Sequence, residues 1–143
     1  MLYTPHQPIG HVGLRSGITT GAIDKFKVTL TGVGTHASAP QNVEDPIAAL
    51  GYEITELQSL ISRELDPFTA SVLSITHLSA GNTWNVIPSN AFFEGTVRTA
   101  DKNVRQETKD LFLKLLIIQL WHITLKLILT STPEIHPLIT IQH

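Results

Sequence analysis

The 143-residue sequence predicts an α+β domain in which strands and helices follow one another along the chain. Three observations support this prediction. One run alternates apolar and polar residues, another repeats apolar residues every three or four positions, and turn-forming residues separate the remaining runs. The expected elements are a strand at residues 24–31, a helix at 46–65, strands at 69–77 and 91–98, a helix from Asp101 and a strand at 123–129. This β-α-β-β-α-β order is that of the ferredoxin-like sandwich, a four-stranded antiparallel sheet with two helices on one face.

The first strand has the most regular pattern. Its even-numbered residues from 26 to 30 are apolar and its odd-numbered residues are polar, which is typical of a strand with one buried face. Gly32 and Gly34 follow, and they permit backbone angles closed to other residues. His36 therefore lies in a glycine-rich loop between a strand and a helix, a place where rigid scaffolds often present functional side chains.

The first helix has clear signals at both ends. Asp45 is expected to cap it, with Pro46 at the first helical position, and Pro67 disfavours helical geometry in the residue before it. The apolar stripe expected to face the sheet consists of Ile47, Leu50, Ile54, Leu57 and Ile61. Glu53 and Glu56 fall mostly off this stripe, so we expect them on the solvent side.

The C-terminal half is less regular. The connection between the strands at 69–77 and 91–98 is too rich in turn formers to be one more strand. In the second helix the residues expected to face inward are Val104, Thr108, Leu111, Phe112 and Leu115. Residues 111–121 are apolar on all sides, which predicts burial on more than one side or an exposed patch. Polar residues interrupt residues 111–129, so a buried helix followed by a strand is favoured over a membrane span.

Composition excludes several classes of protein. The formal net charge of −2 provides no basic surface for nucleic acid and no polybasic patch for a membrane. The sequence contains no cysteine, which excludes disulfides and thiolate metal sites and fits a reducing compartment. The first ten residues include prolines and a histidine where a secretory signal needs an apolar run. A cytoplasmic protein is therefore expected.

Four runs of residues carry a resemblance to a known family. They are GVGTHASAP (residues 32–40), EDPIAA (44–49), GNTWNVIP (81–88) and EGTVRT (94–99). With these runs in this order, the sequence resembles the lid and dimerisation domain of the dinuclear zinc aminoacylase and carboxypeptidase family. It is most similar to the branch of hippurate hydrolases, auxin-conjugate hydrolases and N-acetyl-diaminopimelate deacetylases. The resemblance covers about residues 9–115.

The resemblance implies a domain organisation and a function. Residues 1–17 would be a linker from a catalytic domain missing from this sequence, residues 18–130 the lid, and residues 131–143 a tail. The family enzyme is a zinc-dependent amidohydrolase or metallopeptidase that cleaves N-acyl amino acids or small peptides. Its two zinc ions are bound by the catalytic domain. For this chain, the resemblance implies that such a domain would be a separately encoded partner. We therefore expect no metal ligand in this chain, no activity of the chain alone, and a homodimer formed through the lid.

The resemblance also assigns three site residues. His36 matches a histidine that such lids extend across the dimer, in trans, to hydrogen-bond the oxyanion that develops on the substrate. Asn85 and Arg98 match residues that would together hold the substrate's carboxylate. Since 13 positions correspond to a turn plus one strand, we expect both side chains to reach the same end of the sheet.

Structural alternatives remain open for each of these residues. His36 is otherwise a solvated surface histidine, Asn85 caps or bridges its own turn, and Arg98 forms a surface ion pair with Glu94. The remaining histidines, His6, His11, His77, His122, His136 and His143, show no ligand spacing and are interpreted as structural or solvated. The alternative for the whole chain is a free-standing ferredoxin-like interaction or assembly module with no role in hydrolysis.

Overall fold

The computed structural model describes Ser16, residues 21–123 and residues 126–131. The predicted linker (residues 1–17) and tail (residues 131–143) lie outside the described residues except for Ser16 and Ser131. In chain order the elements are β1 (Ala22–Thr31), β2 (Thr35–His36), the 3₁₀ turn η1 (Pro40–Asn42), α1 (Pro46–Ser59), the π-helical turn η2 (Leu60–Glu64), β3 (Ser71–Ala80), β4 (Val86–Ile87), β5 (Asn90–Thr99), α2 (Lys102–Ile123) and β6 (Lys126–Ser131).

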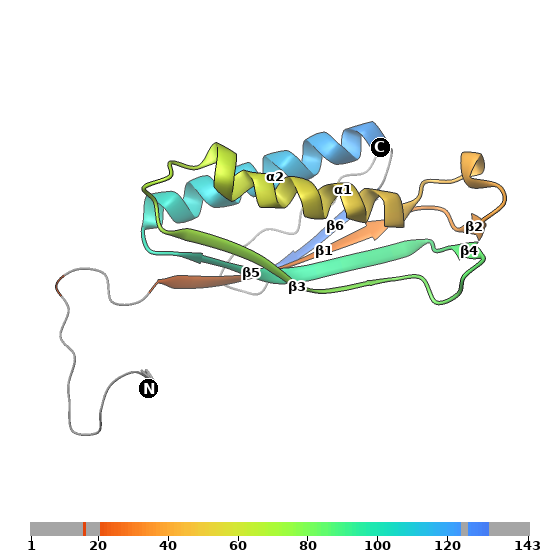
Figure 1. Cartoon of the computed structure of the whole chain (residues 1–143), viewed down its shortest axis with the longest axis horizontal. Coiled ribbons are helices and arrows are strands. Elements are labelled where there is room, and N and C mark those ends of the chain that lie inside the picture. Colours follow the sequence, from red (N-terminus) through yellow and green to blue (C-terminus); the bar gives the residue numbers. More distant parts are fainter. Residues whose placement is uncertain (1–15, 17–20, 124–125, 132–143) are drawn as a thin grey trace, which may run out of the picture.

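The four long strands form one antiparallel sheet in the order β3-β5-β1-β6. The central strands β1 and β5 are paired from Ala22 opposite Thr99 to Thr31 opposite Asn90. Helices α1 and α2 lie side by side over one face of the sheet, and the opposite face carries no helix (Figure 1). The ferredoxin-like prediction is therefore confirmed.

A second, two-stranded sheet of β2 and β4 was not predicted. The connection that was expected to contain no strand includes Val86 and Ile87, which pair with His36 and Thr35. The amide of Gly32 donates to the carbonyl of Ser89 at 2.9 Å, just beyond the ends of β1 and β5. The chain after β1 and the chain before β5 thus stay paired beyond the sheet. This pairing produces strands β2 and β4 in spite of the turn-forming residues around them.

Helix α1 begins as the sequence predicts. The Asp45 carboxylate accepts the backbone amides of Ile47 at 2.8 Å and Ala48 at 3.3 Å, and Pro46 occupies the first turn. These bonds pair amides that a helix N-terminus otherwise leaves unsatisfied. After Ser59 the chain continues through the π-helical turn η2 to Glu64, close to the predicted end.

The buried face of α1 differs from the predicted stripe. Its buried residues are Pro46, Ala49, Leu50, Glu53 and Leu57. Ile47 is 45% exposed and Glu53 is fully buried, so the prediction was wrong for both. Two helical stripes one position apart were compatible with the sequence. The stripe that is buried contains the small Ala49, which permits close packing of α1 against the sheet. Glu53 belongs to the same stripe, one turn further along the helix, and is therefore buried as well.

Helix α2 begins next to the predicted position, and the Asp101 carboxylate accepts the amides of Asn103 at 2.7 Å and Val104 at 3.2 Å. Thr108 and Phe112 are buried, as expected. The helix continues to Ile123, so the last strand starts at Lys126 rather than at 123. Among the described residues, no helix is long and apolar enough to cross a bilayer.

Aromatic rings fill the core between the sheet and α2. The Phe26 ring centroid lies 4.9 Å from that of Phe112 and 6.2 Å from that of Phe93. Gly95 sits opposite Phe26 on β5. A Cβ atom at Gly95 would lie 2.8 Å from the tip of the Phe26 ring and would collide with the carbonyl oxygen of Ser74. The core thus leaves no room for a side chain at this position.

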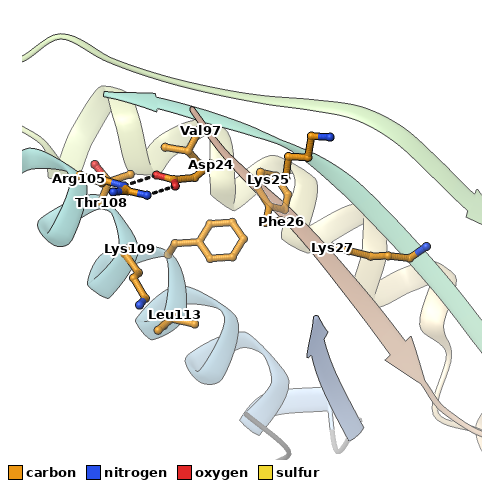
Figure 2. Close-up of a pocket in the computed structure, with 10 residues that line it drawn as sticks. Asp24, Lys25, Phe26, Lys27, Val97, Arg105, Thr108, Lys109 and Leu113 are labelled. Atoms are coloured by element: carbon orange, nitrogen blue, oxygen red, sulfur yellow. Dashed lines mark hydrogen bonds and ion pairs between the residues drawn. The ribbon is translucent and has the colours of Figure 1, made fainter. Parts of the chain in front are cut away.

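One ion pair joins β1 to α2, beside an apolar cavity of about 80 Å³. Figure 2 shows the Arg105 guanidinium facing the Asp24 carboxylate across the space between the strand and the helix. Arg105 Nε donates to Asp24 Oδ2 at 2.7 Å, and Nη2 donates to Oδ1. Asp24 is only 8% exposed, so this two-pronged pairing compensates for removing its charge from water.

Candidate functional site

The β2–β4 ribbon extends beyond one end of the four-stranded sheet (Figure 1). It continues the two central strands, because β2 follows β1 and β4 precedes β5 along the chain. Thr35 pairs with Ile87 and His36 with Val86, and the amide of Ala37 donates to the carbonyl of Asn85 at 2.9 Å. The ribbon is thus anchored in the middle of the sheet while its tip projects away from the core.

Gly34 allows the two segments of the ribbon to approach each other. A Cβ at Gly34 would lie 2.9 Å from the carbonyl oxygen of Ile87 and 3.1 Å from the amide of Ser89. Gly32 and Gly34 do not use the backbone angles that glycine permits, because Gly81 is the glycine with positive φ (68°) among the described residues. The glycine at position 34 is required by close contact instead.

His36 is exposed at the tip of this ribbon. Its ring nitrogen Nδ1 lies 2.8 Å from the Ser38 hydroxyl and 3.2 Å from the Ser38 backbone amide. The amide of Ala39 donates to the carbonyl of His36 at 3.0 Å, which closes a tight turn over residues 36–39. The imidazole is therefore held on one side by its own turn, as a functional side chain on a rigid support would be.

Asn85 lies next to the cross-strand partner of His36, so both residues belong to the ribbon tip. Its side-chain oxygen Oδ1 accepts a hydrogen bond from the Thr83 hydroxyl at 3.2 Å. This contact supports the interpretation that Asn85 bridges its own turn. The side-chain nitrogen of Asn85 carries two further N–H donors. Trp84 precedes it and is 92% exposed.

Arg98 lies at the opposite end of the sheet from Asn85. It pairs with Ile23 on β1 and Val72 on β3, whereas the Asn85 end of β5 is at Asn90. Eight strand residues separate Asn90 from Arg98, about 26 Å at the usual rise per residue. The prediction that both side chains reach one end of the sheet was therefore wrong within a single chain. Arg98 instead lines a pocket of about 300 Å³ with Ile23, Val72 and Thr99.

Glu94 does not pair with Arg98, as one alternative had suggested. Its carboxylate lies 2.7 Å from Nδ1 of His77 and 3.5 Å from Nζ of Lys27, on the sheet face that carries no helix. The hydrogen bond from His77, followed by the charge of Lys27, lowers the pKa of Glu94. His77 is exposed, as predicted, but its ion pair was missed because a bulge between Ile75 and His77 shifts the register of β3.

Among the described residues, no group of three histidine, aspartate or glutamate side chains is arranged to bind a metal ion. The site consists of hydrogen-bond donors at the ribbon tip, with a guanidinium at the far end of the sheet.

Comparison with known proteins identifies the domain. Residues 18–118 match the peptidase dimerisation domain. The N-acetylcysteine deacetylase of Bacillus subtilis is 45% identical over 102 residues, which are 71% of this chain and 27% of that protein. The hippurate hydrolase of Campylobacter jejuni is 35% identical over 102 residues, again 71% of this chain and 27% of that protein.

A solved structure extends the similarity to three dimensions. The crystal structure of a dinuclear metal binding peptidase of Bacillus subtilis matches with a TM-score of 0.66 at 29% identity, covering 97% of this chain and 33% of that one. The chain therefore spans about a quarter of the curated relatives, 27% in both cases, and corresponds to one domain of them. Together with the match over residues 18–118, these similarities show that the chain belongs to the peptidase dimerisation domain family.

Proposed function

We propose that this domain acts as the dimerisation lid of a metal-dependent amidohydrolase or peptidase that cleaves N-acyl amino acids or small peptides. The names of the relatives support this class of substrate, since they include a deacetylase of an N-acetyl amino acid and a hippurate hydrolase. The observation that carries the proposal is the position of His36, exposed on a ribbon that projects from the sheet and held through one ring nitrogen.

In the proposed reaction, His36 contacts the substrate in the active site of a partner subunit. A neutral imidazole there donates a hydrogen bond to the carbonyl oxygen as negative charge develops on it. The metal ions, two zinc ions in the proposed enzyme, would supply an activated water when bound to a catalytic domain. The described residues contain no group of three side chains that could hold a metal ion by themselves, and the role proposed for this domain is to position and stabilise the substrate.

The separation of Asn85 from Arg98 gives this proposal a geometric condition. Arg98 lies about 26 Å along β5 from Asn90, and Asn85 lies beyond the Asn90 end, so the two side chains of one subunit cannot hold a single carboxylate. They can do so if Arg98 comes from one subunit and Asn85, with His36, comes from the other. We therefore assign the substrate's carboxylate to a site shared between two copies of the domain, with the guanidinium as its two-pronged donor.

Homodimer formation and a cytoplasmic location complete the proposal. Strand β3 is at one edge of the sheet, where the backbone of a second lid could add to it. The absence of cysteine from the whole sequence suits a reducing compartment. Light scattering of the purified chain over a range of concentrations tests the dimer, for which the expected mass is twice 15.7 kDa. A monomer at all concentrations would contradict lid-to-lid pairing.

A chimera tests the catalytic role. The lid of the Bacillus subtilis N-acetylcysteine deacetylase is replaced by residues 18–131 of this chain, which include β6, and deacetylation of N-acetylcysteine is measured. His36→Ala is expected to lower kcat about 100-fold, the typical effect of removing an oxyanion donor. His77→Ala is the matched control, since His77 is equally exposed but lies on the open face of the sheet. If both variants keep full activity, the alternative of an interaction module without a hydrolase role is favoured.

A further inference from the structure

The contacts of His36 determine which of its nitrogens carries the proton. A neutral imidazole has one N–H and one lone pair, and the two nitrogens exchange these roles between tautomers. The backbone amide of Ser38, 3.2 Å from Nδ1, can only donate. Nδ1 must therefore present its lone pair, and the proton of the neutral ring resides on Nε2.

The Ser38 hydroxyl reinforces this arrangement. Its Oγ lies 2.8 Å from Nδ1, closer than the amide, and a hydroxyl facing a lone pair donates. The turn closed by the amide of Ala39 and the carbonyl of His36 keeps residue 38 beside the ring. Two donors thus converge on a single acceptor nitrogen, and both belong to the same residue.

We propose that Ser38 is a positioning residue that holds His36 as the Nε2–H tautomer, so that the ribbon tip offers a hydrogen-bond donor to a ligand oxygen. The ligand class follows from this chemistry: a carbonyl, an oxyanion or a carboxylate can accept from Nε2–H. A metal ion cannot bind there without a change of tautomer, because it needs the lone pair. The identification of that oxygen as a substrate carbonyl rests on the proposed function, but the tautomer does not.

His77 provides an internal contrast. Its Nδ1 lies 2.7 Å from a carboxylate oxygen of Glu94. An ionised carboxylate can only accept, so Nδ1 of His77 carries a proton. In the neutral ring the outward Nε2 of His77 then presents a lone pair. Two exposed histidines of one domain are thus expected to have opposite tautomers, each determined by the partner of Nδ1.

The test is ¹⁵N NMR of the histidine ring nitrogens in the full chain, at a pH where neutral imidazole predominates. His36→Gln and His77→Gln variants assign the two rings. We expect His36 to show an unprotonated Nδ1 and a protonated Nε2, and His77 to show the reverse. Ser38→Ala removes the hydroxyl but keeps the backbone amide donor, so it is expected to shift the His36 signals only partway toward the Nδ1–H tautomer and to leave His77 unchanged. Ser38→Thr should restore the wild-type signals, and Glu94→Gln should change His77 alone.

The outcomes separate this inference from the proposed function. A protonated Nδ1 on His36 in the wild type would overturn the assigned tautomer whatever the activity, and signals unaffected by Ser38→Ala would overturn the role of the Ser38 hydroxyl. In the deacetylase chimera, Ser38→Ala is expected to lower kcat about five- to tenfold with little change in KM, the effect of losing one hydrogen bond. If the tautomers are as expected but His36→Ala leaves the chimera active, the positioning role stands and the catalytic proposal fails.

Discussion

Two carboxyl groups are buried in this domain, and they are treated in opposite ways. Asp24 on β1 is 8% exposed and both of its oxygens accept from the Arg105 guanidinium. Glu53 on α1 is fully buried, and neither of its oxygens has a hydrogen-bond partner among the described residues. Burial in an apolar core, followed by repulsion from Glu56, raises the pKa of Glu53 to about 8. Asp24 therefore joins two elements as an ion, whereas Glu53 is buried as a neutral acid.

The difference shows that burial alone does not determine what a carboxyl group contributes to stability. A hydrogen-bonded partner of opposite charge offsets the free-energy cost of burying a carboxylate. Without such a partner the cost is not offset. Stability measurements on four carboxyl groups of the domain can test this distinction.

The largest effect is expected at Arg105. Arg105→Ala removes the partner of a buried carboxylate and is expected to reduce the free energy of unfolding by about 3 kcal/mol, at the lower end for such pairs because Arg105 is partly exposed. Denaturant unfolding at pH 7 measures it. Arg63→Ala is the control, since Arg63 is an exposed arginine at the end of η2. Equal effects of the two variants would contradict a stabilising pair at Asp24.

Glu53→Gln is expected to increase stability by about 2 kcal/mol at pH 7, because it removes a penalty of about 3.5 kcal/mol for keeping the carboxyl protonated but buries an unpaired amide instead. In the unfolded chain the carboxyl ionises near 4.5, whereas in the folded domain it keeps its proton to about 8. Unfolding therefore releases a proton between these values, so the wild type loses stability as pH rises from 4.5 to 8, by about 1.4 kcal/mol per unit, and no further above 8.

The free energy of unfolding measured at intervals from pH 4.5 to 9 checks this sign. Glu53→Gln should remove most of the slope, while Glu56→Gln, on the same helix, should retain it. A wild-type profile that rises with pH through this interval would mean that Glu53 is ionised in the folded domain and has a partner.

An intermediate effect is expected at Asp45, whose carboxylate caps α1. Asp45→Ala should reduce stability by about 1 kcal/mol, because two backbone amides at the helix start lose their acceptor. Asp45→Asn keeps an acceptor oxygen and should retain most of the stability. Thermal unfolding followed by circular dichroism compares them. A larger loss than for Arg105→Ala would contradict the ranking of the cap below the buried pair.

The smallest effect is expected at Glu94, which is paired but exposed. Solvent screens its contacts with His77 and Lys27, so Glu94→Gln should leave the unfolding midpoint at pH 7 close to that of the wild type. The lowered pKa means that any contribution is present near neutrality and disappears in acid. Thermal unfolding at low and high salt measures it. A substantial loss would indicate that another surface covers this face in solution.

The sequence predicted the parts of the fold that depend on local chemistry. The alternation in β1, the cap at Asp45, the start of the second helix near Asp101 and the β-α-β-β-α-β order all follow from patterns within one element or between neighbours. The burial of Glu53 could not be predicted in this way, because two helical stripes were available and only packing against the sheet selects one of them.

The site was predicted in part for the same reason. His36 lies in a presented position, as its glycine-rich surroundings indicated, and Asn85 lies beside it through the pairing of β2 with β4. That pairing joins residues about 50 positions apart, which no local pattern reports. The count of 13 positions between Asn85 and Arg98 was correct, but the length of β5 places them at opposite ends of the sheet. The positions of these three residues relative to one another therefore depend on strand register and strand length, which the sequence pattern does not report.

Gly95 has a consequence for how motifs of this kind are interpreted. It belongs to the same EGTVRT run as Arg98, so the two are found together when sequences are searched. The glycine is required because a side chain would strike Phe26 and the backbone of β3, whereas the arginine is not required by packing at all. A relative could lose all activity and still retain the glycine for as long as it folds. In a survey of such domains, the glycine is therefore expected to report foldability, whereas retention of the arginine bears on the carboxylate-binding role proposed for it.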